Sequence, residues 1–90
     1  MTRFTVVWLQ EARNELAENW LAASGRSAIA KAANTADREL AIDPTTKGIH
    51  LSENLWRLDV RPLRFYFSVR PEDRLVEVTN VGLSPTSQAE

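Results

Sequence analysis

The chain has 90 residues, 43% of them hydrophobic, and a net charge of −1 at pH 7. A chain of this length buries one small core, so we expect a single domain over residues 1–90. The near-neutral charge argues against the broad cationic surface of a general nucleic-acid-binding protein. The absence of cysteine excludes disulfides and thiolate chemistry, and a single histidine argues against a zinc site. We expect no metal and no cofactor.

The apolar segments and the N-terminus bear on where the protein acts. No apolar run approaches the ~18 residues that cross a membrane, and the N-terminus lacks the charged and then apolar pattern of a signal peptide. A chain without cysteine also suits a reducing compartment. We therefore expect a soluble, cytoplasmic protein.

The first half of the chain predicts one strand and two helices. Phe4, Val6 and Trp8 stand at alternate positions, as in a short strand. Apolar residues at helical spacing then predict a helix over residues 10–23 and a second helix over residues 27–42. Because the connection is short and the facing sides are rich in alanine, we expect an antiparallel helical hairpin.

Turn-forming residues set the expected ends of these elements. Gly25 is expected to end the first helix in a left-handed conformation, and Ser27 is expected to cap the start of the second. Pro44 stops the second helix, because the residue before a proline avoids helical geometry. We expect a loop over residues 44–54 and a flexible tail over residues 83–90.

The stretch from Leu55 to Val81 predicts a meander of three strands. Apolar side chains recur at every second position in LWRLDV, LRFYFSV and the start of LVEVTNV, which is the pattern of a sheet buried on one face. The strands are separated by Arg61-Pro62 and by Pro71-Glu72-Asp73, where proline suits a turn. We therefore expect two consecutive antiparallel pairs.

The turns also predict how the strands pair. A tight first turn places Asp59 opposite Arg64, and the second turn places Tyr66 opposite Thr79. Both registers match apolar residues with apolar residues. The uncovered face of the sheet then carries a polar set: Arg57, Asp59, Arg64, Tyr66, Ser68, Glu77 and Thr79.

These elements predict an α+β fold in the order β-α-α-β-β-β, with an antiparallel sheet and a two-helix hairpin packed on one face. Trp8, Trp20 and Trp56 lie on apolar stripes and are expected in the core. The other face of the sheet is expected to be open, and an open face on a small domain often marks where a partner docks.

Several motifs are spread over this order of elements. The chain opens with F-x-V-x-W, its first helix carries A-x-x-x-L-x-x-x-W, and WRLDVRPLRFYFSV leads to VEVTNVG. This pattern resembles the RelE/ParE superfamily of bacterial toxins, in which the meander carries an aromatic residue, Arg-Leu-Arg, Arg-Val-x-Tyr and Val-x-Val-x-x-Val-Gly. The resemblance covers residues 3–82, and the matching positions are Trp56, Arg57, Leu58, Arg64, Phe65, Phe67, Val76, Val78, Val81 and Gly82.

The resemblance implies the toxin of a type II toxin–antitoxin module, neutralised by a cognate antitoxin that is usually encoded alongside. It implies one of two targets: ribosome-bound mRNA, which is cleaved, or DNA gyrase, which is inhibited. The sequence departs from the RNA-cleaving branch in two places. The basic residues and the Tyr or His that follow Val-Gly in that branch are missing, and Asp59 replaces the second arginine of the first meander strand.

Cleavage of RNA by its own 2′-hydroxyl needs a base, cations for the charge of the phosphorane, and an acid. Arg64 is the candidate cation, and Arg57 is the second candidate catalytic residue. The candidates for the base are His50, Glu77 and Tyr66. The residues expected to bind the substrate are Arg61, Lys47, His50 and Tyr66.

Ordinary structural roles also explain several of these residues. Arg64 can form a cross-strand ion pair with Asp59, Arg57 can stack on Tyr66, and loop residues such as His50 are commonly solvated. Three functions stay open: a ribosome-dependent mRNA-cleaving toxin, a non-enzymatic gyrase inhibitor, and a catalytically degenerate protein that only binds an antitoxin.

Overall fold

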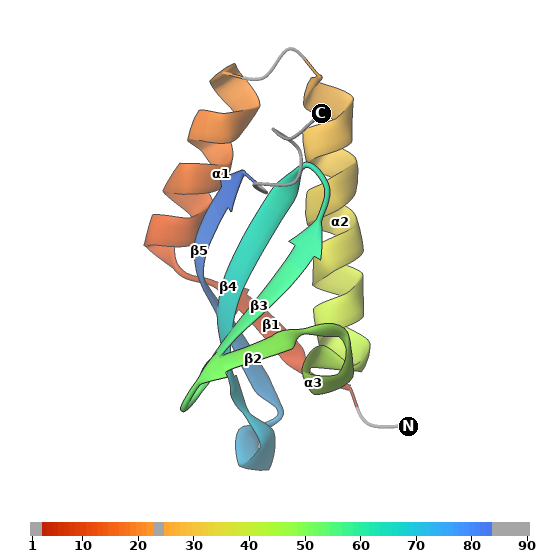
Figure 1. Ribbon diagram of the computed structural model, residues 1–90, viewed down its shortest axis with the longest axis vertical. Helices are drawn as coiled ribbons and strands as arrows, with labels where there is room; N and C mark the ends of the chain where they lie inside the picture. The colour runs from red at the N-terminus through yellow and green to blue at the C-terminus, as the bar shows by residue number, and fades with distance from the viewer. Residues whose placement is uncertain (1–2, 23–24, 84–90) are drawn as a thin grey trace.

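The computed structural model describes residues 3–22 and 25–83. Within these ranges the elements follow the order β-α-α-α-β-β-β-β (Figure 1). None of the helices described has the length and apolar character that a membrane span requires. The helices are α1 (Gln10–Ala22), α2 (Arg26–Ile42) and α3 (Pro44–Lys47), and the strands are β1 (Thr5–Trp8), β2 (Ile49–Ser52), β3 (Leu55–Val60), β4 (Leu63–Arg70) and β5 (Leu75–Leu83), with a 3-10 turn over Pro71–Asp73.

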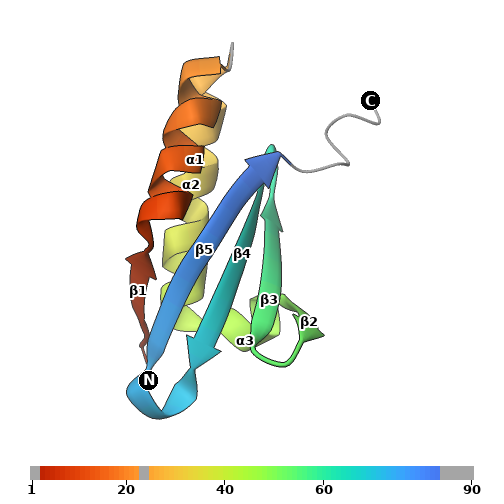
Figure 2. The same ribbon diagram turned by 90° about the vertical axis from the view of Figure 1, so that its left-hand side faces the viewer.

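The strands form one sheet in the order β1-β5-β4-β3-β2. β1 runs parallel to β5, and the other neighbours are antiparallel. α1 and α2 lie side by side on one face of the sheet, and in the described part of the chain no helix covers the opposite face of β3, β4 and β5 (Figure 2). The predicted α+β class and the helical hairpin on one face are confirmed.

The predicted register of the meander is confirmed over most of its length. β3 pairs with β4 so that Asp59 lies opposite Arg64. β4 pairs with β5 so that Phe67 lies opposite Val78. The cis peptide bond between Arg61 and Pro62 belongs to the tight turn between β3 and β4. The short turns and the apolar pairs thus determine the register together.

The predicted partner of Tyr66 is wrong. A bulge between Tyr66 and Phe67 shifts the pairing of β4 with β5, so that Asn80 rather than Thr79 lies opposite Tyr66. Thr79 is the extra residue of β5, and its hydroxyl donates a hydrogen bond to the Tyr66 carbonyl oxygen at 3.2 Å. The bulge brings Asn80 to the open face beside Tyr66.

The expectation of a loop over residues 44–54 is also wrong, because this segment contains α3 and β2. α2 stops at Ile42 as predicted, but Pro44 then occupies the start of α3, a position where the missing N–H of proline costs nothing. All four residues of β2 are exposed, so this edge strand lacks the buried alternation by which a strand is recognised in a sequence. The sheet therefore has one strand more than predicted.

The ends of the helices differ from the sequence-based expectation. Gly25 has a φ of −105° and is the N-cap of α2, so it is not left-handed, and α2 begins at Arg26 rather than at Ser27. β5 extends into the first residue of the expected tail. Residues 23–24 and the remaining tail, residues 84–90, lie outside the described residues.

The core lies between the helices and the covered face of the sheet. Phe65 and Phe67 of β4 are fully buried, and Trp8 and Trp56 pack partly buried against the same core. Trp20 is 39% exposed, so its expected place in the core is wrong. It lines an open groove between α1 and α2 instead. The helices contribute Ala12, Ile29, Ala32, Ala36 and Leu40 to the core.

Glu15 joins α1 to the free edge of β5. β1 ends before β5 does, and the last backbone contact runs from the Leu9 N–H to the Val78 carbonyl oxygen at 3.0 Å. Beyond this point Glu15 Oε1 accepts a hydrogen bond from the Val81 N–H at 2.7 Å, and Glu15 Oε2 accepts one from the Asn80 amide at 3.3 Å. A charged acceptor thus satisfies a backbone donor that has no partner strand.

Gly48 allows α3 and β2 to pack closely on Phe67. A Cβ at this position would lie 2.6 Å from Phe67 Cζ and 3.0 Å from the Pro44 carbonyl oxygen. We predict that Gly48→Ala lowers the free energy of unfolding by about 1–3 kcal/mol, the usual cost of overpacking, as measured by urea denaturation. Gly82→Ala is the control, because a Cβ there meets no atom within 4 Å. Equal losses in the two variants would contradict the packing role of Gly48.

The contact of Glu15 with β5 predicts a second stability effect. Glu15→Ala removes the acceptor of the Val81 N–H and is expected to lower the free energy of unfolding by about 1–3 kcal/mol. Glu15→Gln keeps an acceptor oxygen and should lose less. Glu18→Ala, an exposed position on the same helix, should change stability by no more than about 0.5 kcal/mol. If Glu15→Ala and Glu18→Ala are equally stable in urea, the contact contributes nothing.

Candidate functional site

The open face of the sheet gathers charged residues from β3 and β4. Side chains alternate between the two faces of a strand, and the residues between the core positions of these strands are polar. Arg57 lies opposite Tyr66, and Asp59 lies opposite Arg64. These four side chains share one face and form what we call the arginine cluster.

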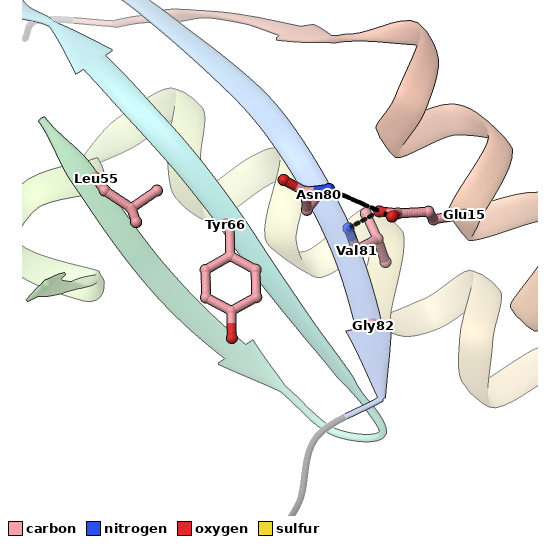
Figure 3. A pocket seen from close by; sticks show the side chains of 6 residues that line it. All are labelled: Glu15, Leu55, Tyr66, Asn80, Val81 and Gly82. Carbon is pink, nitrogen blue, oxygen red and sulfur yellow. Dashed lines mark hydrogen bonds between the residues drawn. The ribbon is translucent and has the colours of Figure 1, made fainter.

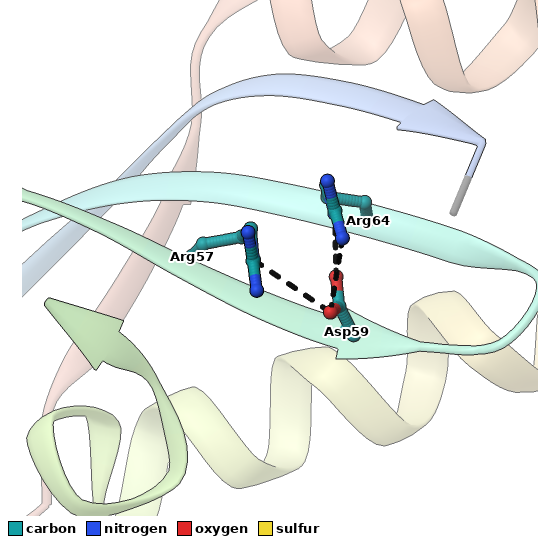
Figure 4. Close-up of polar contacts among 3 residues, drawn as sticks. All are labelled: Arg57, Asp59 and Arg64. Atoms are coloured by element: carbon teal, nitrogen blue, oxygen red, sulfur yellow. Dashed lines mark hydrogen bonds and ion pairs between the residues drawn. The ribbon is translucent and has the colours of Figure 1, made fainter. Parts of the chain in front are cut away.

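One carboxylate faces both guanidinium groups of the arginine cluster (Figure 4). Arg64 Nε donates to Asp59 Oδ1 at 2.8 Å, and Arg64 Nη2 donates to Asp59 Oδ2 at 3.3 Å. Arg57 Nε lies 3.6 Å from Asp59 Oδ2 and has no hydrogen-bond partner among the described residues. The cross-strand ion pair between Arg64 and Asp59 is confirmed. Two positive charges and one negative charge leave the cluster with a net positive charge.

Asp59 also strengthens the cationic character of Arg64. Its hydrogen bond raises the pKa of Arg64 above the ordinary value, and this effect exceeds that of partial burial, which lowers the pKa. Tyr66 adds a smaller contribution in the raising direction. Because a guanidinium group keeps its proton at physiological pH, Arg64 is a fixed cation, suited to hold an anion and unsuited to exchange a proton.

A shallow cavity of about 400 Å³ lies on the same face of the sheet (Figure 3). Gly82 lies opposite Arg64 in the ladder and has no side chain to fill the space. The aromatic ring of Tyr66 suits stacking with a nucleotide base. The cations of Arg57 and Arg64 lie beside the cavity rather than in its lining, which contains the carboxylate of Glu15. The cavity is lined by Glu15, Leu55, Tyr66, Asn80, Val81 and Gly82.

The structure places His50 away from the arginine cluster. His50 pairs with Trp56 across β2 and β3, and the centroids of the two rings lie 4.7 Å apart. Trp56 packs against the core, so His50 shares the face opposite to that of Arg57. His50 Nε2 lies 2.7 Å from the Glu53 carbonyl oxygen.

The other predicted site residues are spread over the molecule. Lys47 is exposed at the end of α3, which contacts α2 and β2. Arg61 is exposed in the turn between β3 and β4. Of the residues predicted to form the site, the structure brings Arg57, Arg64 and Tyr66 together.

Glu77, a candidate base, is engaged further along the sheet. It lies opposite Ser68, whose hydroxyl donates to Glu77 Oε1 at 3.5 Å, and Arg70 Nη2 lies 3.6 Å from the same oxygen. Tyr66 is thus the candidate base that belongs to the arginine cluster. In the described part of the chain, no group of three or more His, Asp or Glu side chains is placed to hold a metal ion.

The residues that line the cavity opposite Tyr66 were not predicted. Glu15 lies 65 positions before its partner Asn80 in the chain, and no local pattern connects them. A signal for the bulge is nevertheless present in VEVTNV, where Thr79 and Asn80 place two polar residues between apolar ones and break the alternation. That break in the alternation marks the bulge, beyond which Asn80 rather than Thr79 lies opposite Tyr66.

Comparison with solved structures finds the same fold in toxin–antitoxin proteins. A chain of the RelBE2 toxin–antitoxin complex from Mycobacterium tuberculosis matches with a TM-score of 0.77 and 20% identity, over 93% of this chain and 94% of that chain. A mutant of the E. coli toxin RelE in the free state matches with a TM-score of 0.67 and 17% identity, over 98% and 90%. A chain of the chromosomal ParDE system from P. aeruginosa matches with a TM-score of 0.66 and 13% identity, over 90% and 96%.

At the level of sequence, neither a family model nor a curated protein matches the chain. Each structural match extends over nearly the whole length of this chain and of the chain it is compared with. The similarity therefore concerns the complete arrangement of helices and sheet. The fold implied by the sequence motifs is confirmed. The chain has the RelE/ParE fold.

Proposed function

We propose that this protein is the toxin of a toxin–antitoxin pair and that it acts on ribosome-bound mRNA. The observation that carries the proposal is the placement of Arg57 and Arg64 on the uncovered face of a sheet whose fold is shared with RelE. One carboxylate neutralises only part of the charge of the two guanidinium groups, so the cluster presents a net positive charge to a phosphate backbone. Contacts of this kind dominate affinity for RNA.

The arginine cluster offers part of the chemistry that RNA cleavage needs. Attack of a 2′-hydroxyl on the adjacent phosphorus breaks the bond to the 5′-oxygen, and the reaction requires stabilisation of the extra negative charge. Arg64 supplies a cation that stays charged, because a guanidinium group keeps its proton at physiological pH. Tyr66 is the group of the cluster that can exchange a proton with a reacting oxygen. Arg57 supplies the second cation.

A second candidate function is inhibition of DNA gyrase without cleavage. The fold is as similar to the ParDE chain, with a TM-score of 0.66, as it is to free RelE, with a TM-score of 0.67. His50 and Glu77 are engaged away from Arg64, which leaves Tyr66 as the candidate base in the cluster. A toxin that inhibits gyrase by binding alone does not require a further catalytic base or acid.

We infer that the partner is a cognate antitoxin. Solved structures with this fold include the RelBE2 complex from Mycobacterium tuberculosis and the intact RelBE complex from E. coli. On this chain, an apolar helix fits the groove lined by Leu16, Trp20 and Ile29 between α1 and α2, and an extended segment fits the free edge of β2.

The test of mRNA cleavage is primer extension on a defined message in a bacterial translation extract. We predict cuts that appear only on translated message, and we expect Arg64→Ala to reduce cutting by about 100-fold, as removal of a positioned charge commonly does. Arg70→Ala is the matched control. It removes an arginine with 53% side-chain exposure from the same strand and outside the cluster, and it should cut like the unmodified protein.

The remaining outcomes separate the candidate functions. Circular dichroism establishes that each variant is folded before it is assayed. An intact message in the presence of folded protein would contradict cleavage, and a supercoiling assay with purified gyrase then tests the second candidate. If expression without an antitoxin causes no growth arrest, antitoxin binding is the activity that is left.

A further inference from the structure

Asp59 occupies the place that an anionic ligand of the arginine cluster would take. Arg64 meets it with two nitrogen atoms, at 2.8 and 3.3 Å, and Arg57 Nε lies 3.6 Å from Asp59 Oδ2. This side-on, paired contact is the one by which arginine recognises both carboxylates and phosphates. The edge of Arg64 that best fits a phosphate is already occupied by a group of the protein itself.

The sheet does not depend on this carboxylate. The neighbouring pairs Leu58–Phe65 and Val60–Leu63 are apolar and hold the register of β3 and β4. The side chain of Asp59 is 31% exposed and that of Arg64 is 17% exposed, so the ion pair is partly open to water and its contribution to stability is modest. The register of β3 and β4 therefore does not require an acidic side chain between the two arginines.

Arg57 gives an independent sign that the arginine cluster is not closed on itself. Its Nε is buried and has no hydrogen-bond partner among the described residues, although a carboxylate oxygen lies 3.6 Å away. A buried donor without an acceptor is unfavourable and is stabilised when an acceptor arrives. A phosphate oxygen at this place would satisfy Arg57 and compete with Asp59 for Arg64.

We propose that Asp59 is an internal counter-anion that sets the affinity and selectivity of the arginine cluster for the phosphodiester backbone of single-stranded RNA. The inference rests on the proposed function, because it takes RNA as the ligand. When RNA binds, Arg64 exchanges the carboxylate for a phosphate oxygen, and the displaced carboxylate repels the backbone. Free RNA is therefore held weakly, and only RNA that is positioned by further interactions is retained.

Asp59→Asn tests the proposal with little change in shape. The amide oxygen of asparagine still accepts a hydrogen bond from Arg64, while the negative charge is removed. We predict that the variant binds a short fluorescent single-stranded RNA about three- to tenfold more tightly than the unmodified protein at low salt. The slope of log affinity against log salt concentration should steepen by about 0.7 for each additional phosphate that the variant neutralises. Fluorescence anisotropy measures both quantities.

Two further variants show whether the effect belongs to the arginine cluster. Asp73→Asn removes the same charge from the exposed turn at the other end of β4, and it should leave the affinity unchanged. An equal increase in affinity in both variants would overturn the proposal, because net charge alone would explain it. In a protein that already carries Arg64→Ala, adding Asp59→Asn should no longer increase the affinity for RNA. An increase in affinity over Arg64→Ala alone would equally overturn the proposal.

The outcome of the Asp59→Asn binding experiment can be distinguished from a folding defect and from the outcome of the cleavage test. If thermal unfolding shows that Asp59→Asn is not folded, Asp59→Ser replaces it, with the same expected increase in affinity. Unchanged affinity in a folded variant, or tighter binding of single-stranded DNA but not of RNA, rejects the counter-anion. Cleavage by the unmodified protein together with unchanged binding by Asp59→Asn rejects this inference alone. Tighter binding of RNA by Asp59→Asn, in the absence of cleavage and of growth arrest, rejects the proposed function. The role of Asp59 as counter-anion of the arginine cluster would then still stand.

Discussion

The alternation of side chains along β4 is the constraint on which the rest of the structure depends. β4 is the central strand and pairs with β3 on one side and β5 on the other. Phe65 and Phe67 are fully buried beneath the helices, so Arg64 and Tyr66 must lie on the opposite face. A slip of one residue would bury a guanidinium group in the core and expose both phenylalanines, which is strongly unfavourable.

The same constraint gives the arginine cluster its geometry. Its members come from two paired strands rather than from loops, with Asp59 and Arg64 beside the tight turn that joins these strands, and their neighbours are locked in a packed core. Side chains on such a support keep their distances better than side chains on a mobile segment. The bulge in β5 adds to this, because it turns Asn80 toward Tyr66 and gives the cavity its second wall.

A feature of the fold could be predicted from the sequence when the residues that determine it are close together in the chain. The pairing of Asp59 with Arg64 was predictable, because a tight turn and apolar neighbours are all it requires. β2 was not, because an exposed edge strand buries no face and leaves no alternation. Treating that segment as a loop placed His50 near the site, whereas its pairing with Trp56 directs it to the other face. The contact of Glu15 with β5 connects distant parts of the chain and leaves no local trace.

The way α1 covers the end of β5 has a consequence for self-association. A strand edge with unpaired N–H and C=O groups is a template for strands of other molecules. On β5, past the last pair with β1, an incoming strand would have to displace the carboxylate of Glu15 from the Val81 N–H and would meet the side of a helix (Figure 1). The longest strand of the sheet is thereby protected from adding strands along this part of its edge, which leaves the short strands β1 and β2 as the edge strands of the sheet.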